Sequence, residues 1–265
     1  MRSNLFSALL VSVSLFLASC GGSKTAEETP AAGNGPKPIT AQFKMLTINA
    51  QHGLKDKTDV KKFANWVKET GAELVAVQQI VRATDSKPDF DAFTELLKRL
   101  DMRGTFAKAR YFQGWDSGNA LFCMYPMLQS NAYTLPTGKG RTRRSLAFGV
   151  FEMGLKSMAF ASTDLDEEDL SERVKQVYEI IAIQKQMEET PIIVAGNFGE
   201  QPKGKGPSKM LERYICANST GDGTTGLNQH VYLPSNAKLK TIAAEKAVYK
   251  PLNATGLLVT VEVTQ

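Results

Sequence analysis

The feature that most constrains the fold is a short apolar run that leads the chain into a glycine-rich turn. Residues 191–195 read Pro-Ile-Ile-Val-Ala, and Gly-Asn-Phe-Gly follows at 196–199. A continuous apolar segment of this length, bounded by Pro and Gly, is typical of a strand that is buried on both faces. The segment before it, 168–187, carries apolar residues at helical spacing. A long helix followed directly by a buried strand predicts mixed α and β layers, with Asn197 just past the strand.

The rest of the chain continues this alternation. We expect helices at 61–71 and 90–100, where apolar residues recur on one face. The acidic start of 168–187 suits the positive end of a helix dipole. Runs of consecutive strands lie between the helices. The expected strands are 43–49, 74–77, 121–124, 146–151, 158–162, 192–195, 230–233 and 257–263.

The amino terminus has the pattern of an export signal. Arg2 precedes an apolar stretch, Leu5–Leu17, which is well short of the roughly 20 residues that cross a bilayer. Leu17-Ala18-Ser19-Cys20 then matches the bacterial lipobox, so we expect residues 1–19 to be a lipoprotein signal peptide and Cys20 to be lipidated. An ordinary secretory peptide with an incidental cysteine is the alternative.

Residues 20–39 contain no large apolar side chain before Ile39, so we interpret them as the lipidated cysteine and a flexible tether. Residues 40–265 suit one domain with a substantial core. These features predict a protein of the bacterial cell envelope, held to the outer membrane by lipid at Cys20. The sequence leaves the periplasmic or surface side open.

Charge and cysteine content narrow the partners. The formal net charge is +5, including Arg2 of the signal segment. This bias is too weak to predict a nucleic-acid partner. Cys123 and Cys216 each lie in an apolar context. An exported protein can pair them, but two buried thiols are favoured.

Several short motifs, in order and spacing over nearly the whole domain, resemble those of the endonuclease/exonuclease/phosphatase superfamily of metal-dependent phosphoesterases. They are Thr47-Ile48-Asn49, Glu73-Leu74-Val75-Ala76-Val77-Gln78-Gln79, Gly118-Asn119-Ala120-Leu121 with Tyr125-Pro126, Arg144-Ser145-Leu146, Ser162-Thr163-Asp164-Leu165-Asp166, Arg173 with Gln176, Gly196-Asn197-Phe198-Gly199, Gln229-His230-Val231-Tyr232-Leu233 and Asn253-Ala254-Thr255-Gly256-Leu257. The resemblance implies an α+β fold: a four-layer α/β/β/α sandwich in which helices flank two packed, mostly antiparallel sheets.

The same resemblance implies that the catalytic groups are largely replaced. Family members use a carboxylate-bound Mg²⁺ or Mn²⁺, an aspartate that activates water, and histidines that stabilise the developing charge. Here the corresponding positions, which we call the vestigial pocket, are Asn49, Gln79 for Glu, Asp164 for His, Asn197 for the catalytic Asp, Gly199 for Asn, Gln229 for Asp, and Ala254 and Thr255 for the closing Asp-His pair. Only Asn49 keeps the family residue.

These departures predict a catalytically inactive domain with no cofactor. Uncharged amides are poor Mg²⁺ ligands compared with carboxylates, and Asn197 and Thr255 cannot act as general bases near neutral pH. Because Gln79 and Asn197 are near-isosteres of the acids they replace, the pocket can keep its shape without its charge. It would then bind a polar ligand, such as a sugar or nucleotide, or an envelope protein; a relic surface without a ligand is an equal alternative.

The alternative function is a metal-dependent phosphoesterase with a rebuilt site at Asp164, Asp166 and Glu200, which would require Mg²⁺ or Mn²⁺. Asp164 and Asp166 are then the candidate metal ligands. The acidic run 164–169 is more simply explained as the capped and solvated start of a helix.

Two further sets of residues have less specific patterns. The basic residues of two glycine-containing loops can form an anion-binding rim, but a solvated loop is favoured because aromatic residues are not interleaved with them. They are Lys139, Arg141, Arg143, Arg144, Lys203 and Lys205. For His52 and His230 a structural role is favoured, since neither occupies a catalytic histidine position.

Overall fold

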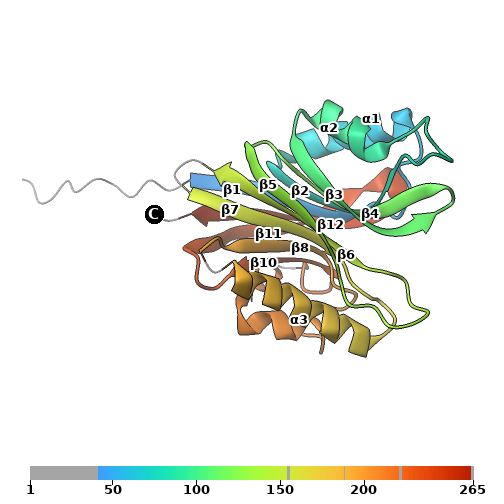
Figure 1. Cartoon of the computed structure of the whole chain (residues 1–265). Coiled ribbons are helices and arrows are strands. Elements are labelled where there is room, and N and C mark those ends of the chain that lie inside the picture. The colour runs from blue at the N-terminus through green and yellow to red at the C-terminus, as the bar shows by residue number, and fades with distance from the viewer. Residues whose placement is uncertain (1–40, 154–155, 188, 221–222, 264–265) are drawn as a thin grey trace, which may run out of the picture. The chain divides into compact units, whose positions relative to one another are not determined.

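The structure is a computed structural model that describes residues 41–153, 156–187, 189–220 and 223–263. The expected signal peptide, 1–19, and the tether with Cys20, 20–39, lie outside the described residues and stay predictions. The described chain forms one unit with two six-stranded sheets (Figure 1). None of the described helices is long and apolar enough to cross a membrane.

The first sheet has the strand order β11-β12-β1-β2-β4-β3. Its strands are β1 (Ala41–Asn49), β2 (Leu74–Arg82), β3 (Arg103–Phe112), β4 (Trp115–Cys123), β11 (Leu239–Tyr249) and β12 (Ala254–Val263). The central strands β1 and β2 run parallel, and every other neighbouring pair is antiparallel.

The second sheet has the order β5-β6-β7-β8-β10-β9. Its strands are β5 (Met127–Thr134), β6 (Ser145–Met153), β7 (Lys156–Asp164), β8 (Ile192–Asn197), β9 (Tyr214–Cys216) and β10 (Gln229–Pro234). Again the central pair, β7 and β8, is parallel and the remaining pairs are antiparallel.

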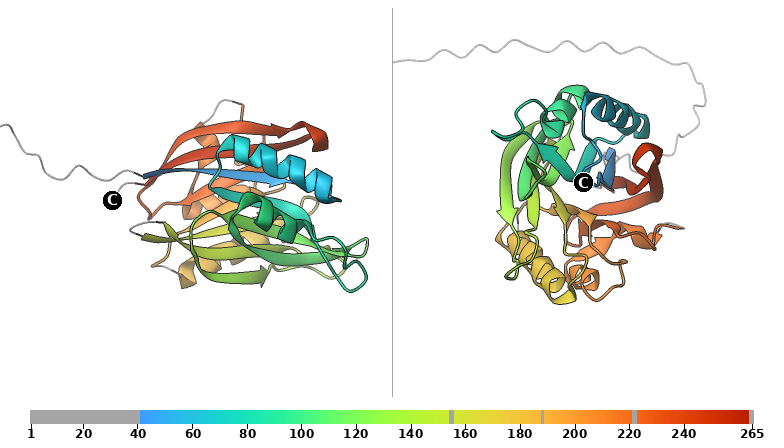
Figure 2. Two further views of the ribbon diagram at one scale, coloured as in Figure 1. Left: turned by 90° about the horizontal axis from the view of Figure 1, so that it is seen from above. Right: turned by 90° about the vertical axis from the view of Figure 1, so that its right-hand side faces the viewer.

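Helices cover the two outer faces. Helices α1 (Lys57–Thr70) and α2 (Ala92–Leu100) pack on the first sheet, and α3 (Leu170–Gln186) packs on the second, as the views from three directions show (Figures 1 and 2). Three short 3₁₀ helices lie in the loops: η1 (Pro207–Glu212), η2 (Ala217–Thr220) and η3 (Lys250–Leu252). The four-layer sandwich and its mostly antiparallel sheets are therefore confirmed.

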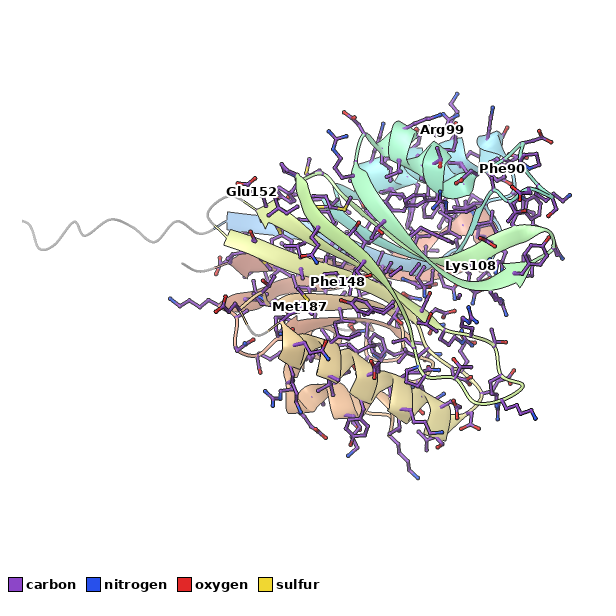
Figure 3. All side chains as sticks on the ribbon, in the orientation of Figure 1. Phe90, Arg99, Lys108, Phe148, Glu152 and Met187 are labelled. Atoms are coloured by element: carbon purple, nitrogen blue, oxygen red, sulfur yellow. The ribbon has the colours of Figure 1, made fainter. Side chains whose placement is uncertain are left out.

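Three apolar layers hold the sandwich together. The middle layer lies between the sheets and includes Met45, Phe151 and Val259. The outer layers join each sheet to its helices: Phe63 of α1 packs in one, and Phe148 of β6, labelled in Figure 3, packs in the other. Because these side chains are almost fully removed from water, burial of apolar surface is the main stabilising contribution. Cys123 and Cys216 are buried thiols rather than a disulfide.

Aspartates begin all three α-helices. The side chains of Asp56, Asp91 and Asp169 accept hydrogen bonds from backbone N–H groups of the first turn. This satisfies donors that have no partner within the helix. The cap at Asp56 starts α1 four residues before the helix expected at 61–71, and the αL residue Gly71 ends it as expected.

The strands that the sequence did not predict are the four sheet edges: β3 and β11 in the first sheet, β5 and β9 in the second. Each edge strand is hydrogen-bonded to a strand of its sheet on one side alone. The side chains of β5 and β11 are largely exposed. Their mixed polar sequences lack the continuous apolar runs that mark the buried central strands.

Each sheet contains the same strand–helix–strand unit, β1-α1-β2 in one and β7-α3-β8 in the other. In a parallel pair the carboxyl ends of both strands lie at one edge. Asn49, Asp164 and Asn197, which end β1, β7 and β8, are thereby placed at that edge of their sheets. Gly196 allows the close pairing of β7 and β8: a Cβ at this position, where φ is +152°, would lie 1.9 Å from the Thr163 carbonyl oxygen.

We therefore expect Gly196→Ala to lower the free energy of unfolding by about 3 kcal/mol, because backbone must move to admit the methyl group. Gly226→Ala is the matched control, since a Cβ there meets nothing within 4 Å. Urea denaturation followed by circular dichroism measures both. Equal stabilities of the two variants would contradict the close approach at Gly196.

Candidate ligand site

Most residues of the vestigial pocket meet at the carboxyl ends of the parallel strands. Asn49 ends β1, Asp164 ends β7 beside Asn197 at the end of β8, and Gln229 pairs with Asn197 from β10. Asn49, Asn197, Gln229 and Thr255 line one shared pocket. Ala254 differs from them, because its side chain packs in the apolar layer beneath α1 and α2.

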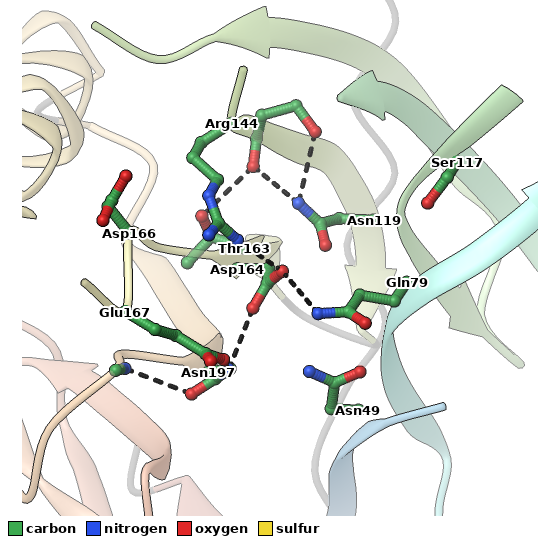
Figure 4. A network of polar contacts seen from close by, with 12 residues as sticks. Asn49, Gln79, Ser117, Asn119, Arg144, Thr163, Asp164, Asp166, Glu167 and Asn197 are labelled. Atoms are coloured by element: carbon green, nitrogen blue, oxygen red, sulfur yellow. Dashed lines mark hydrogen bonds and ion pairs between the residues drawn. The ribbon is translucent and has the colours of Figure 1, made fainter. Parts of the chain in front are cut away.

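Asp164 lies at the centre of the site and is nearly inaccessible to water. Its Oδ2 accepts hydrogen bonds from Arg144 Nη1 at 2.8 Å and from Gln79 Nε2 at 3.2 Å, and its Oδ1 accepts from Asn197 Nδ2 at 3.0 Å. Figure 4 shows these three side chains converging on the carboxylate. With Glu167, described next, we call this group the Asp164 cluster.

Glu167 is the member that sequence analysis assigned only to the helix start. Its Oε1 accepts a hydrogen bond from Asn197 Nδ2, the amide nitrogen that also contacts Asp164. Asn197 Oδ1 accepts from the backbone N–H of Gly199 at 3.1 Å. Gly199 has φ +69°, a conformation that glycine adopts without strain and that asparagine tolerates better than most residues. The turn after β8 thus fixes the Asn197 amide with its nitrogen toward two carboxylates.

Two opposing effects act on the Asp164 carboxyl. Burial disfavours the charged form and raises its pKa above the ordinary value, while the Arg144 guanidinium and the Gln79 and Asn197 amides favour the ionised form. The Arg144–Asp164 ion pair is itself largely buried, with 14% and 7% of the two side chains exposed. A buried carboxylate of this kind is tolerated because a cation and two donors are held against it.

A β-bulge in β2 brings Gln79 into the site. The register of β2 against β4 shifts between Val77 and Ile80, and Gln79 has a positive φ of 53°. Bulges of this kind redirect a side chain at the rim of a sheet. Gln79 therefore points toward Asp164, while its neighbour Gln78 is fully buried between the sheets.

A second network of hydrogen bonds, buried within the sandwich, joins the two sheets. Gln78 Nε2 donates to Thr47 Oγ1 at 3.2 Å and to Ser162 Oγ at 3.3 Å, and Thr47 Oγ1 donates to Gln229 Oε1 at 2.8 Å. Gln229 therefore serves as an acceptor inside the sandwich. Sequence analysis named Gln229 but missed Gln78, Thr47 and Ser162, because their pairing joins residues that are distant in the sequence.

Two adjoining pockets open at the Asp164 cluster. The Arg144 pocket has a volume of about 410 Å³ and is lined by Gln79, Arg110, Gly140, Arg141, Thr142, Arg144, Asp166, Glu167 and Glu168. The Asn49 pocket, of about 300 Å³, is lined by Asn49, Gln51, Glu167, Asn197, Gly226, Leu227, Asn228, Gln229 and Thr255. Glu167 belongs to both walls, so its side chain divides them.

The basic residues expected as a rim separate into two groups. Arg144 points inward to Asp164, whereas Lys139, Arg143, Lys203 and Lys205 are exposed. Arg141 lines the Arg144 pocket, is also exposed, and pairs with Asp169 at 2.6 Å. The structure adds Arg110 from β3, which sequence analysis missed because β3 itself was not predicted.

The donor set does not fit the metal that the fold implies. Asp166 Oδ1 accepts the backbone N–H groups of Glu168 and Asp169, and Glu200 pairs with Arg173 on α3. These two carboxylates are engaged apart from Asp164, which already has a cation against it. No group of three His, Cys, Asp or Glu side chains suited to a metal occurs among the described residues.

Both histidines are buried and hydrogen-bonded. His52 Nε2 lies 2.7 Å from Ser117 Oγ and its ring stacks on Phe112. Burial and the charges of Arg110 and Lys55 lower the pKa of His52 to about 4. His230 Nδ1 lies 3.1 Å from the Tyr232 hydroxyl, and burial lowers its pKa to about 3. Both contribute to structure in the neutral form.

The fold is that of the endonuclease/exonuclease/phosphatase proteins. A Bacteroides thetaiotaomicron member of that family superimposes with a TM-score of 0.65 at 11% identity, over 86% of this chain and 99% of that chain. A Bacteroides vulgatus endonuclease/exonuclease/phosphatase gives 0.67 at 14% identity, over 84% and 99%. The human Nocturnin catalytic domain, solved with a bound sulfate anion, gives 0.65 at 16% identity, over 86% and 97%.

No protein-family sequence model matches the chain, and neither does any curated protein sequence. The likeness to the solved structures therefore shows the fold, and the site must be interpreted from its own geometry.

The Arg144–Asp164 ion pair should contribute substantially to stability. Arg144→Met leaves a buried carboxylate without its cation and should destabilise the protein by about 3 kcal/mol. Adding Asp164→Asn should recover part of the loss, because the charge is removed as well. Arg141→Met, on the same loop, is the control and should change little, since its ion pair is exposed. The midpoints of urea denaturation compare the stabilities of these variants. If the double variant is no more stable than Arg144→Met, the proposed pairing is contradicted.

The two buried histidines should make the stability of the protein depend on pH. Because the folded-state pKa values of His52 and His230 lie below the ordinary 6.5, the unfolded chain binds protons first as the pH falls. Their stabilising contribution is complete above about pH 7 and falls by about 2 kcal/mol per histidine between pH 7 and pH 5. His52→Gln should remove its share from the pH dependence of urea denaturation. An unchanged slope would show that His52 is not buried as a neutral ring.

Proposed function

We propose that this chain is a lipid-anchored protein of the bacterial cell envelope whose endonuclease/exonuclease/phosphatase-like domain is catalytically inactive and serves as a binding module. The observation that carries the proposal is the Asp164 cluster. Arg144, Gln79 and Asn197 donate to its central carboxylate, and Gln79 and Asn197 occupy the positions at which the family resemblance implies a metal-binding Glu and a catalytic Asp.

Charge explains why the cluster is stable without a metal. Mg²⁺ and Mn²⁺ are held by carboxylates, whereas Gln79 and Asn197 present uncharged amides. The amide nitrogens of both residues point to Asp164, and a nitrogen donor cannot ligate a cation. The Arg144 guanidinium supplies a fixed positive charge in the same place. A metal ion would have to displace it and leave it buried without its partner.

The groups that would move a proton are missing as well. Asn197 cannot accept a proton near neutral pH, and its oxygen already accepts the Gly199 N–H. Thr255, on the wall of the Asn49 pocket, does not titrate near neutral pH. Loss of the metal and the base together removes most of what lowers a phosphoester barrier. The pockets nevertheless remain open, so binding is the function that survives.

The pockets support a small polar ligand better than an extended nucleic acid. Their walls are amides, hydroxyls, carboxylates and guanidinium groups, which suit hydroxyl-bearing molecules such as sugars or nucleotides. One protein with this fold is described as a mannosyl-6-phosphatase of Bacteroides thetaiotaomicron, at 10% identity and a TM-score of 0.62. Lipid at Cys20 would hold the module at the outer membrane, where an envelope protein is the alternative partner.

The test is hydrolysis and metal binding by the purified protein. We expect no turnover of bis(p-nitrophenyl) phosphate or p-nitrophenyl phosphate with Mg²⁺ or Mn²⁺ beyond that of Asn49→Ala. Isothermal titration calorimetry should give no saturable Mn²⁺ binding in the micromolar range. Turnover at enzyme-like rates that is lost in Asn49→Ala would overturn the proposal and favour a rebuilt phosphoesterase site.

A further inference from the structure

Arg110 is a cation of the site that carries no counter-charge. Among the described residues no carboxylate lies within ion-pair distance of it, whereas Arg141 pairs with Asp169 and Arg144 with Asp164. Its guanidinium carbon lies 5.8 Å from the centre of the Phe112 ring. Its charge also helps to lower the pKa of His52, which keeps that neighbouring ring neutral. The positive charge of Arg110 is therefore available to a ligand.

Arg110 and Arg144 approach the same space from different elements. Both line the Arg144 pocket and also a narrow recess at its inner end, together with Gln79 and Thr142. Arg144 reaches Asp164 with Nη1, while its buried Nε has no hydrogen-bond partner among the described residues. Ser117, Asn119 and the Asp164 carboxylate complete the recess, and Asp164 is already paired with Arg144. Arg110 is therefore a cation of this recess that carries no counter-charge among the described residues.

The same pocket also carries acceptors. Asp166, Glu167 and Glu168 contribute to the lining of the Arg144 pocket. Asp166 is engaged with backbone N–H groups, and Glu168 lies 3.6 Å from Arg141, so Glu167 is the carboxylate best placed to accept a ligand hydroxyl. The pocket therefore offers both a cation without a counter-charge and an accepting carboxylate. A ligand that matches both groups carries an anionic group and hydroxyl groups on one small frame.

We infer that Arg110 and Arg144 form a metal-independent subsite for the oxyanionic group of a small hydroxyl-bearing ligand, such as a sugar acid or a sugar phosphate. The guanidinium of Arg110 binds the oxyanion, Gln79 and Thr142 frame it, and Glu167 accepts from a hydroxyl group. The volume of about 410 Å³ suits a ligand of monosaccharide size. The inference rests on the proposed binding function and names its ligand class.

The experiment uses the purified full chain and isothermal titration calorimetry with four probes: D-glucuronate, D-glucose 6-phosphate, D-glucose and sodium chloride. The two acids differ from glucose in their anionic group, so they separate carboxylate from phosphate as the source of the oxyanion. We expect saturable binding of at least one acid, at least tenfold tighter than glucose. Chloride at matched ionic strength should give no saturable signal.

Variants on a single strand assign the binding to Arg110. Arg110→Gln should weaken binding of the acid at least tenfold, and Arg110→Lys should weaken it less, because the charge remains without the planar fork. Arg103→Gln, at the other end of β3, is the matched control and should bind as the wild type does. Circular dichroism establishes that each variant is folded.

The outcomes separate this inference from the function on which it rests. Equal binding by Arg110→Gln and wild type, or binding of glucose as tight as that of both acids, overturns the oxyanion subsite while the inactive binding module stands. Absence of saturable binding by either acid overturns it equally. Hydrolysis of glucose 6-phosphate during the titration, detected as released phosphate, would overturn the proposed function itself.

Discussion

The ion pair between Arg144 and Asp164 is the interaction on which the site depends. It joins the loop before β6 to the end of β7, and through Gln79 and Asn197 it is also connected to the bulge of β2 and the end of β8. Four segments from two sheets therefore meet at one carboxylate. The cluster holds these segments together, because moving any one of them away would leave a buried charge or hydrogen-bond donor without a partner. The arrangement does for the strand ends what a bound cation does in a metal site: it neutralises a charge and holds its ligands together.

The backbone explains why these groups meet. Two β-α-β units place parallel strand ends at an edge of each sheet, and packing of the sheets brings both edges together. Gly196 permits the close pairing of β7 and β8, the bulge at Gln79 turns one amide into the site, and the positive φ of Gly199 aims the other. The family resemblance implies acidic side chains at several of these positions, and the proposed exchange of those acids for amides requires no change in these backbone features. The fold is therefore compatible with the proposed loss of catalysis.

Sequence reasoning succeeded where a signal is local. Continuous apolar runs such as 192–195 identified the central strands, and the order of short motifs identified the sandwich and placed Asn49, Gln79, Asp164, Asn197 and Gln229 at one edge. The edge strands β3, β5, β9 and β11 escaped because exposure on one side removes the continuous apolar pattern. Arg110 was missed for that reason, and Glu167 because an acidic run at a helix start has a sufficient local explanation. Contacts between distant segments leave no spacing in the sequence to detect.

Glu167 and Arg110 then decide how the retained pocket differs from an inert remnant. A relic surface would be expected to neutralise its charges internally, as Asp164 and Arg144 do and as Arg141 does with Asp169. Arg110 has no such partner among the described residues, and Glu167 stands exposed between two pockets with one amide against it. An uncompensated cation and an accessible carboxylate can both line one small polar pocket because water solvates each of them. A ligand of complementary charge that replaces this water would gain charge-assisted hydrogen bonds to both groups. These two groups therefore argue for a ligand more strongly than the shape of the fold does.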